Sequence, residues 1–162
     1  MNHCGECGVC CTWLTIDDPV LPKPAGVRCF NLAAGGGCAI YEGRPRACVE
    51  FKCVWLHAVE DGKGPPAEMR PDRAGVMLDA VGPRTLIARC APGRPEAWKA
   101  AGVRAYLERA VRAGAAVIIS VEAGSRRKLV MTAEPKTGVI RVRSERFTAP
   151  DAAGVQRQEG KT

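Results

Sequence analysis

Cys4-Gly5-Glu6-Cys7-Gly8-Val9-Cys10-Cys11 places four thiols within eight residues near the start of the chain. Eight of the nine cysteines lie in the first 53 of the 162 residues. Thiols at this density form disulfides, bind metal or carry out redox chemistry. Which of these applies depends on whether the surroundings of the protein are oxidising or reducing.

The segment MNHCGECGVCCTWLTIDD contains no basic stretch followed by an apolar one, so we expect no secretory signal peptide. The longest mostly apolar stretch, residues 113–121, is shorter than the roughly 20 residues that a membrane-spanning helix needs. We therefore expect a soluble cytoplasmic protein with no membrane partner. In that compartment the thiols stay reduced, which favours metal binding over structural disulfides.

The chain divides into two parts by composition. Residues 1–60 carry 5 Lys/Arg against 6 Asp/Glu, a net charge of −1, while residues 61–162 carry 19 against 11, a net charge of +8. The boundary is rich in Gly and Pro, which favour neither a helix nor a central strand. We predict a cysteine-cluster module over 1–60, a linker over 61–72, a basic α+β module over 73–148 and a flexible tail over 149–162.

The first 60 residues contain few large aliphatic side chains. A module this small usually needs a disulfide or a metal in order to fold. In a reducing compartment the metal is the available choice, so folding and metal binding would be coupled. The predicted ligands are the eight cysteines of this module: Cys4, Cys7, Cys10, Cys11, Cys29, Cys38, Cys48 and Cys53.

The spacing of the first cysteines bears on which metal binds. Cys4, Cys7 and Cys10 form a double Cys-x-x-Cys run, as in the bacterial ferredoxins that hold a 4Fe–4S cluster. A closed site of four thiolates is instead the common structural zinc site. The run favours an iron–sulfur cluster, with Zn²⁺ as the alternative. Cys10 and Cys11 are adjacent, so they serve either different metals or one metal through an irregular turn.

The other four cysteines are spread over a longer segment. The run Gly35-Gly36-Gly37 predicts a turn that returns the chain to Cys38, and it lacks the pattern of a nucleotide-binding loop. Pro45 to about Val59 predicts a helix, because proline favours a first helical turn. On that helix Cys48 and Cys53 would lie about 140° apart. They can face one metal only if the helix breaks or the site lies beside it.

The cysteine pattern resembles that of a known family. The residues concerned are Cys4-x2-Cys7-x2-Cys10-Cys11, Cys29-x2-Leu32 and Cys38-Ala-Ile40-Tyr41-x2-Arg44-Pro45-x2-Cys48-x2-Phe51. They are similar to the CxxCxxCC zinc- or iron-chelating family of YkgJ-like proteins, and flagellin lysine methylases share the cysteine pattern. The resemblance covers about the first third of the chain. It implies metal chelation by Cys4, Cys7, Cys10, Cys11, Cys29, Cys38 and Cys48, with Cys53 as a further cysteine.

The second part of the chain predicts a small α+β unit. Its expected elements are strands at 74–81 and 85–90, a helix at 95–112, and strands at 116–121, 129–132 and 138–143. The order β-β-α-β-β, followed by the last strand, predicts a small antiparallel sheet with one packed helix. This part has no histidine and no pair of acids at a catalytic spacing, so we predict no active site in it.

Several single residues have two interpretations. We expect Cys90 to be a buried core thiol and His3 and His57 to be ordinary surface histidines, although either histidine could replace a thiolate. Four basic residues interleave with the cysteines and either stabilise thiolate charge or lie on a solvated surface: Arg28, Arg44, Arg46 and Lys52.

The basic second part suggests a partner. The basic residues concerned are Arg104, Arg109, Arg112, Arg126, Arg127, Lys128, Arg141 and Arg143. Aromatic residues for base stacking are missing among them, which disfavours nucleic acid relative to an acidic protein partner or a solvated face. The sequence thus predicts a metal-binding protein. The alternative is an enzyme, either an iron–sulfur oxidoreductase or an accessory to protein modification, as the likeness to flagellin methylases implies.

Overall fold

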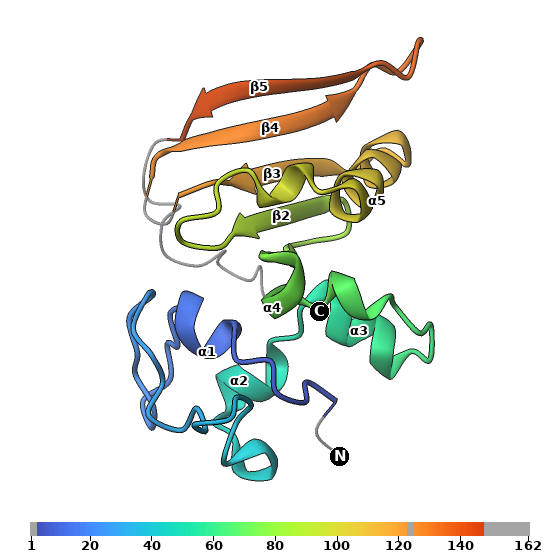
Figure 1. The fold of residues 1–162 in the computed structure, drawn as a ribbon. Helices are drawn as coiled ribbons and strands as arrows, with labels where there is room; N and C mark the ends of the chain where they lie inside the picture. The colour runs from blue at the N-terminus through green and yellow to red at the C-terminus, as the bar shows by residue number, and fades with distance from the viewer. Residues whose placement is uncertain (1–2, 123–124, 148–162) are drawn as a thin grey trace, which may run out of the picture.

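The computed structural model describes residues 3–122 and 125–147. A five-stranded sheet with a long helix lies above a module of loops and short helices that contains the cysteine cluster (Figure 1). The predicted α+β class is confirmed. The predicted tail over 149–162 lies outside the described residues. Within these residues no helix has the length and apolar character needed to cross a bilayer.

The sheet has the strand order β1-β2-β3-β4-β5. Its strands are β1 (Val76–Ala80), β2 (Thr85–Cys90), β3 (Ala116–Ser120), β4 (Arg127–Ala133) and β5 (Ile140–Arg146). Strands β2 and β3 pair in parallel, whereas the other neighbouring pairs are antiparallel. The expectation of a wholly antiparallel sheet is therefore wrong. Helix α5 (Ala101–Arg112) crosses over between β2 and β3 and returns the chain to the end where β2 began, which makes the two strands parallel.

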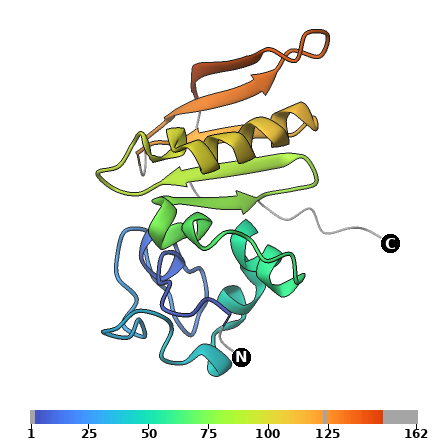
Figure 2. The ribbon, with the colours of Figure 1, turned by 45° about the vertical axis from the view of Figure 1, so that its right-hand side comes forward.

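One face of the sheet is covered by α5 (Figure 2). Its apolar stripe includes Val103, Leu107 and Val111, all buried as the spacing predicts. Leu107 is fully buried against the sheet. The predicted helix 95–112 is divided, because η3 (Ala97–Lys99) precedes α5. Cys90 is buried in this core, which confirms that it is a core thiol. We call β1 to β5 with η3 and α5 the sheet unit.

The cysteine module, residues 3–60, has little regular structure. Its helices are α1 (Cys10–Trp13), η1 (Tyr41–Gly43), α2 (Arg46–Glu50) and α3 (Val54–Glu60). The single helix predicted from Pro45 to Val59 is wrong, because Phe51 and Cys53 have extended backbone between α2 and α3. Cys53 occupies the N-cap position of α3. There the amides of Leu56 and Trp55 act on its sulfur and lower its pKa against the larger effect of burial.

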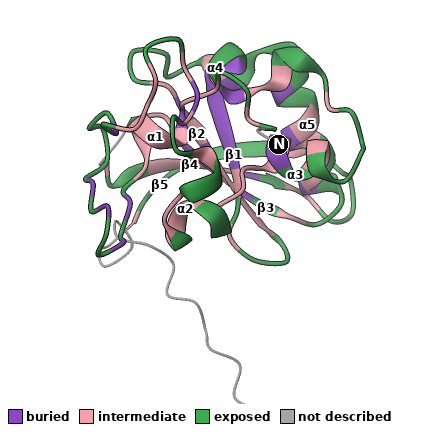
Figure 3. Cartoon of the chain, turned by 90° about the horizontal axis from the view of Figure 1, so that it is seen from below, coloured by how far each residue is buried: buried purple, intermediate pink, exposed green. Residues whose placement is uncertain are grey.

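The segment between the two units is partly helical. The predicted linker, 61–72, was expected to contain no helix. However, η2 (Ala67–Met69) lies within it, and α4 (Pro71–Ala74) begins within it and extends past its end. Pro71 takes the first position of α4, where its missing N–H has no helical partner to lose. Helices α3 and α4 both contact β1. The first three residues of the edge strand β1 are consequently buried, and much of this strand is purple in Figure 3.

The predicted turn at the glycine run is confirmed. Leu32 and Cys38 form an isolated antiparallel bridge, and Gly36 and Gly37 between them have positive φ values of 91° and 75°. The turn also packs against the first cysteine loop, because the N–H of Gly37 donates to the carbonyl of Glu6 at 2.9 Å. The run therefore joins two cysteine-bearing segments that are far apart in the sequence.

Candidate metal centre

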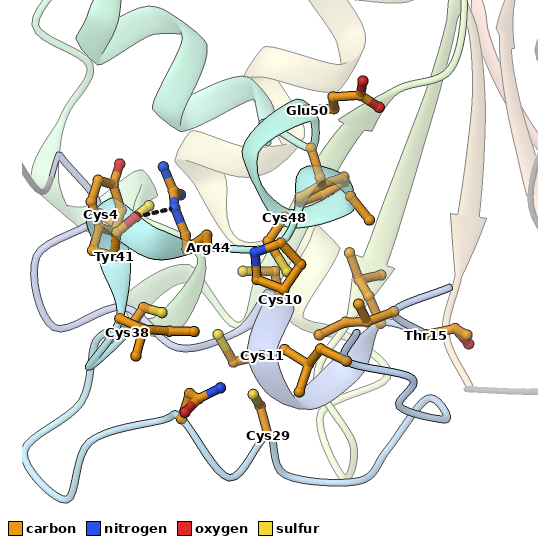
Figure 4. A pocket seen from close by; sticks show the side chains of 18 of the residues that line it. Cys4, Cys10, Cys11, Thr15, Cys29, Cys38, Tyr41, Arg44, Cys48 and Glu50 are labelled. Atoms are coloured by element: carbon orange, nitrogen blue, oxygen red, sulfur yellow. Dashed lines mark hydrogen bonds between the residues drawn. The ribbon is translucent and has the colours of Figure 1, made fainter. Parts of the chain in front are cut away.

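Most of the predicted ligands line a single cavity of about 540 Å³ in the cysteine module (Figure 4). The cysteines on its wall are Cys4, Cys7, Cys10, Cys11, Cys29, Cys38 and Cys48. Cys53 lies instead on an adjoining cavity of about 40 Å³. All nine cysteines belong to the described part of the chain, and none forms a disulfide. The structure thus brings together thiols that are separated by up to 44 positions, from Cys4 to Cys48.

The first cysteine loop is shaped by tight backbone contacts. The N–H of Cys7 donates to the carbonyl of Cys4 at 3.1 Å, and Gly5 between them has a φ of 57°. Gly8 lies against the side chain of Leu32, where an added Cβ would be 2.3 Å from a methyl carbon. A larger residue at position 8 would push the loop away from the segment that carries Cys29 and Cys38.

A buried lysine braces the loop that follows α1. Lys23 is only 6 % exposed, and its Nζ donates to the carbonyls of Leu14, Val27 and Pro24 at 2.5, 2.8 and 3.1 Å. Its positive charge is also among the influences that lower the pKa of Cys11. Lys23 was missed from the sequence, because no local pattern distinguishes a buried lysine from an exposed one.

A buried carboxylate links the same loop to α2. Asp18 is 8 % exposed and accepts hydrogen bonds from the N–H of Val20 at 2.9 Å and of Ala47 at 3.4 Å. Ala47 lies in the first turn of α2, where a carboxylate stabilises unsatisfied amides. The contact fixes the helix that carries Cys48. Asp18 was also missed, although an aspartate before proline is typical of a turn.

The thiols mostly resist ionisation in the absence of metal. Burial raises the pKa of Cys4 to about 11, and the charges of Cys53 and Cys7 add to the rise. Burial is also the main cause of a raised pKa at Cys38 and Cys48. A metal binding here would therefore have to displace the thiol protons, as thiolate ligation requires.

Cys11 is the exception in this group. The thiol of Cys10 donates a hydrogen bond to its sulfur and lowers the pKa of Cys11 to about 7, while the same bond raises the pKa of Cys10. Lys23 and Arg44 lower the pKa of Cys11 further by their charges. The adjacent pair therefore has two different environments.

Backbone amides two residues further along the chain favour three of the thiolates. Burial raises the pKa of Cys7, and a hydrogen bond from the amide of Val9 opposes this. The amide of Ile40 has the same effect on Cys38. At Cys53 the amide two residues on, that of Trp55, likewise acts against burial. Amide hydrogen bonds to sulfur are a recognised means of tuning thiolate-ligated metals.

Arg44 places a positive charge on the walls of both cavities. It lines both cavities, and its Nε donates to the carbonyl of Tyr41 at 2.7 Å (Figure 4). Its guanidinium carbon lies 3.6 Å from the centre of the Tyr41 ring. The Tyr41 side chain is hydrogen-bonded to Cys4, and this bond lowers the pKa of that thiol against the larger effect of burial. The charge of Arg44 favours thiolates on both cavities.

The other basic residues near the cysteines are engaged elsewhere. Arg46 pairs with Glu50 at 2.6 Å, and Lys52 pairs with Glu60 at 2.6 Å. Arg28 donates to backbone carbonyls. His3 and His57 are exposed and lie on the wall of neither cavity. Of these candidates, the structure brings Arg44 to the cysteines.

The described cysteines do not form a finished coordination shell. Across residues 3–122 and 125–147, no group of three or more His, Cys, Asp or Glu side chains is arranged to hold a metal ion as it stands. The donor chemistry nevertheless fits a soft metal, since the cavity wall offers thiols together with a cation and amides that favour thiolates. Cys4, Cys7, Cys10, Cys11, Cys29, Cys38, Cys48 and Cys53 remain the candidate ligands.

The basic residues of the sheet unit do not share one element. Arg104 and Arg112 lie on α5 and pair with Glu108 at 2.8 and 3.4 Å. Arg109 also lies on α5, with its guanidinium carbon 5.7 Å from the centre of the Tyr106 ring. The remaining five lie on or beside strands β4 and β5, where Lys128 donates to the hydroxyl of Ser120 at 2.8 Å. The helix arginines are thus partly neutralised, which agrees with a solvated helix face.

Comparisons of this chain with protein-family models, with curated proteins and with solved structures found no match.

Proposed function

We propose that this protein binds metal through its cysteine module, as an iron–sulfur cluster or as Zn²⁺. The observation that carries the proposal is the meeting of seven cysteines from distant segments on the wall of one cavity. Cysteines that serve only as core residues would be expected to lie apart, each packed among apolar neighbours, as Cys90 is. The resemblance of the cysteine pattern to the CxxCxxCC family supports the same conclusion.

The surroundings of the thiols support a thiolate-ligated metal of either kind. Arg44 supplies positive charge on both cavities, and backbone amides favour the thiolates of Cys7 and Cys38. Four thiolates leave a net charge of about −2 on a zinc ion, which a nearby cation stabilises. The double Cys-x-x-Cys run favours the iron–sulfur cluster. Either bound metal would crosslink the module. Only an iron–sulfur cluster would also transfer electrons.

A direct measurement distinguishes the two metals. The full chain is purified without oxygen, its visible spectrum is recorded, and zinc, iron and sulfide are quantified per chain. A brown protein with broad absorption at roughly 400 nm and bound sulfide means an iron–sulfur cluster. A colourless protein with stoichiometric zinc means a zinc site. Reduced, folded protein that takes up neither metal contradicts the proposal.

The size of the larger cavity favours a second candidate function. About 540 Å³ is within the range of small-molecule sites and exceeds the space that a single ion occupies. An iron–sulfur oxidoreductase, or an accessory to protein modification, would use such space for a substrate beside the metal. A cluster that cycles between two oxidation states while the protein is folded would support this candidate. A closed, redox-inactive zinc site would contradict it.

We assign the sheet unit a supporting role in this function. Its edge strand β1 packs against helix α3 of the module. Its basic β4–β5 region is suited to an acidic protein partner. Nucleic acid is the less favoured partner, because stacking aromatics are missing among the basic residues. Retention of the protein on immobilised DNA or RNA that weakens with salt would reverse this order. The reduced thiols fit a cytoplasmic location.

A further inference from the structure

The two cavities divide the cysteines. Cys11, Cys29 and Cys38 lie only on the larger cavity, whereas Cys53 lies only on the smaller one. The remaining thiols, those of Cys4, Cys7, Cys10 and Cys48, line both. The two cavities therefore share a wall formed by these four cysteines. Their other contacts decide with which cavity each of the four is grouped.

The larger cavity's own cysteines are joined by direct packing. Cys29 is 4 % exposed and forms a small buried cluster against which Cys11 and Cys48 pack. The N–H of Cys29 donates to the carbonyl of Cys11 at 2.8 Å. Cys38 joins them through Leu32, which bridges to Cys38 and whose N–H donates to the carbonyl of Cys29 at 3.1 Å. Figure 4 shows the side chains of Cys11 and Cys29 next to one another beside α1.

The smaller cavity gathers a different set. Cys4 and Cys7 are joined by the hydrogen bond of their turn, and both line this cavity together with Cys10 and Cys53. The rest of its wall includes Leu56 of α3, Pro71 of α4 and Met77 of β1. This set therefore lies where the cysteine module meets the sheet unit.

Two of the shared thiols are grouped by their packing and backbone contacts. Cys48 packs against the buried cluster that contains Cys29. Cys4 is joined to Cys7 by the hydrogen bond of their turn, in the loop that reaches the smaller cavity. Cys48 is therefore grouped with the larger cavity and Cys4 with the smaller, although both lie on the common wall.

The adjacent pair Cys10 and Cys11 is separated by helix geometry. Both lie in α1, and neighbouring residues of an α-helix point about 100° apart around its axis. Cys11 faces the buried cluster around Cys29, whereas Cys10 borders the smaller cavity as well. The two thiols are hydrogen-bonded to each other, but we assign them to different sites. Cys48 and Cys53 are separated by the break between helices α2 and α3.

We propose that the eight cysteines form two separate metal sites of four thiolates each, which divide between Cys10 and Cys11 of α1. The outer cysteines are Cys11, Cys29, Cys38 and Cys48. The inner cysteines are Cys4, Cys7, Cys10 and Cys53. The proposal rests on the proposed metal-binding function and adds the number of sites and their ligands. Each set has the ligand count of a tetrahedral zinc site or a 4Fe–4S cluster.

The two sites differ in what their loading does to the molecule. The outer site crosslinks loops within the cysteine module. The inner site joins the first loop to Cys53 at the start of α3, the helix that contacts β1. Loading it therefore crosslinks the first loop to the helix that packs on the sheet unit. Arg44 lines both cavities, so one cation compensates thiolate charge at both sites.

The test is cadmium-113 NMR on the full-length protein, reduced, freed of metal and titrated with Cd²⁺, which takes thiolate ligands as zinc does. We expect two cadmium resonances per chain in wild-type protein. Correlation from cadmium to cysteine β-protons should connect one resonance to the outer cysteines and the other to the inner cysteines. A single resonance, or resonances that share or mix the two sets, overturns the division while leaving metal binding intact. No cadmium uptake contradicts the proposed function as well.

Two single substitutions test the division independently. Cys29→Ser should remove the outer resonance and keep the inner one, and Cys53→Ser should do the reverse. The control is Cys90→Ser, in the sheet core, which should keep both resonances. Loss of both resonances in folded Cys29→Ser protein contradicts separate sites. The wild-type correlations decide the question if a variant fails to fold.

Discussion

The sheet unit and the cysteine module differ in how much apolar surface each one buries. The main buried cluster contains 12 residues, all in the sheet unit except Ala74 of α4, and its members Leu107, Val117 and Ile119 are inaccessible to solvent. The corresponding cluster of the module has three buried residues, namely Ile16, Leu21 and Cys29. Hydrophobic burial contributes about 25 cal/mol per Å² and can support the first region but not the second. We therefore expect the sheet unit to fold on its own core and the cysteine module to need metal bound by its thiols.

Metal removal should produce the largest difference in stability between the two regions. In reduced, metal-free protein we expect amide hydrogen exchange in residues 4–53 to become at least about 100-fold faster, because a structural zinc contributes on the order of 10 kcal/mol to such a module. Exchange in β2 and β3 should stay slow. Mass spectrometry of peptides from both regions measures the difference, and unchanged protection of the module would show that it folds without metal.

A cavity in the sheet core should weaken the sheet unit and leave the metal sites intact. Leu107 is fully buried, so Leu107→Ala should lower the free energy of unfolding by about 2–5 kcal/mol. Thermal and denaturant unfolding measure this loss, and metal per chain should not change. The matched control is Val142→Ala at an exposed position of β5, with an effect within about 0.5 kcal/mol. Loss of metal from folded Leu107→Ala protein would show that the two regions are coupled.

The glycine run offers a matched pair of substitutions within the module. Gly36 has a φ of 91°, and an added Cβ would lie 2.3 Å from the carbonyl oxygen of Glu6. Gly36→Ala should therefore destabilise the loop by about 1–3 kcal/mol and speed the loss of metal to a chelator. At Gly35 an added Cβ meets nothing within 4 Å, so Gly35→Ala should release metal at the wild-type rate. Equal rates for the two variants would exclude a role for this turn in holding the site.

The smallest effect expected is a difference in reactivity between thiols, measured on metal-free protein under conditions in which hydrogen exchange shows the module to be folded. A lowered pKa means that the thiolate of Cys11 persists to lower pH, whereas Cys4, with its raised pKa, stays protonated. From pH 6 to pH 8 the alkylation rate of Cys11 should rise about tenfold and begin to level off near the upper end. Labelling with iodoacetamide and mass spectrometry follows each cysteine. Cys10→Ala removes the thiol that donates to Cys11 and should raise the pKa of Cys11. An unchanged pH profile in this variant would show that the hydrogen bond from Cys10 does not set that pKa.

Much of the sheet unit could be predicted from local patterns. Strand β2 has the predicted bounds, and the spacing of apolar residues located α5 and its buried face. The pairing of β2 with β3 could not be predicted from these patterns alone, because it depends on where the chain goes after β2. The parallel pairing follows once α5 is recognised as a crossover between two neighbouring strands.

The candidate ligands were also predicted from the sequence, and their surroundings were not. The structure adds two buried charges, Lys23, which bonds to three carbonyls of its own loop, and Asp18, which accepts from the amide of Ala47. It also singles out Arg44 among four basic residues. A charged residue carries no local sign of whether distant carbonyls or amides will be available to it. The expected helix from Pro45 to Val59 is wrong for a similar reason, since the break at Phe51 allows Cys53 to cap α3.

Residue types and their short-range spacing were enough to show that eight thiols occur together, that glycines permit tight turns between them, and that a strand–helix pattern follows. Each segment carries these properties with it, wherever the rest of the chain lies. Which thiols face which cavity follows only from the tertiary structure, because it depends on the direction of α1, on the break between α2 and α3, and on the packing of loops against one another. Cys10 and Cys11 show the difference, since they are neighbours in the chain and lie in distinct environments.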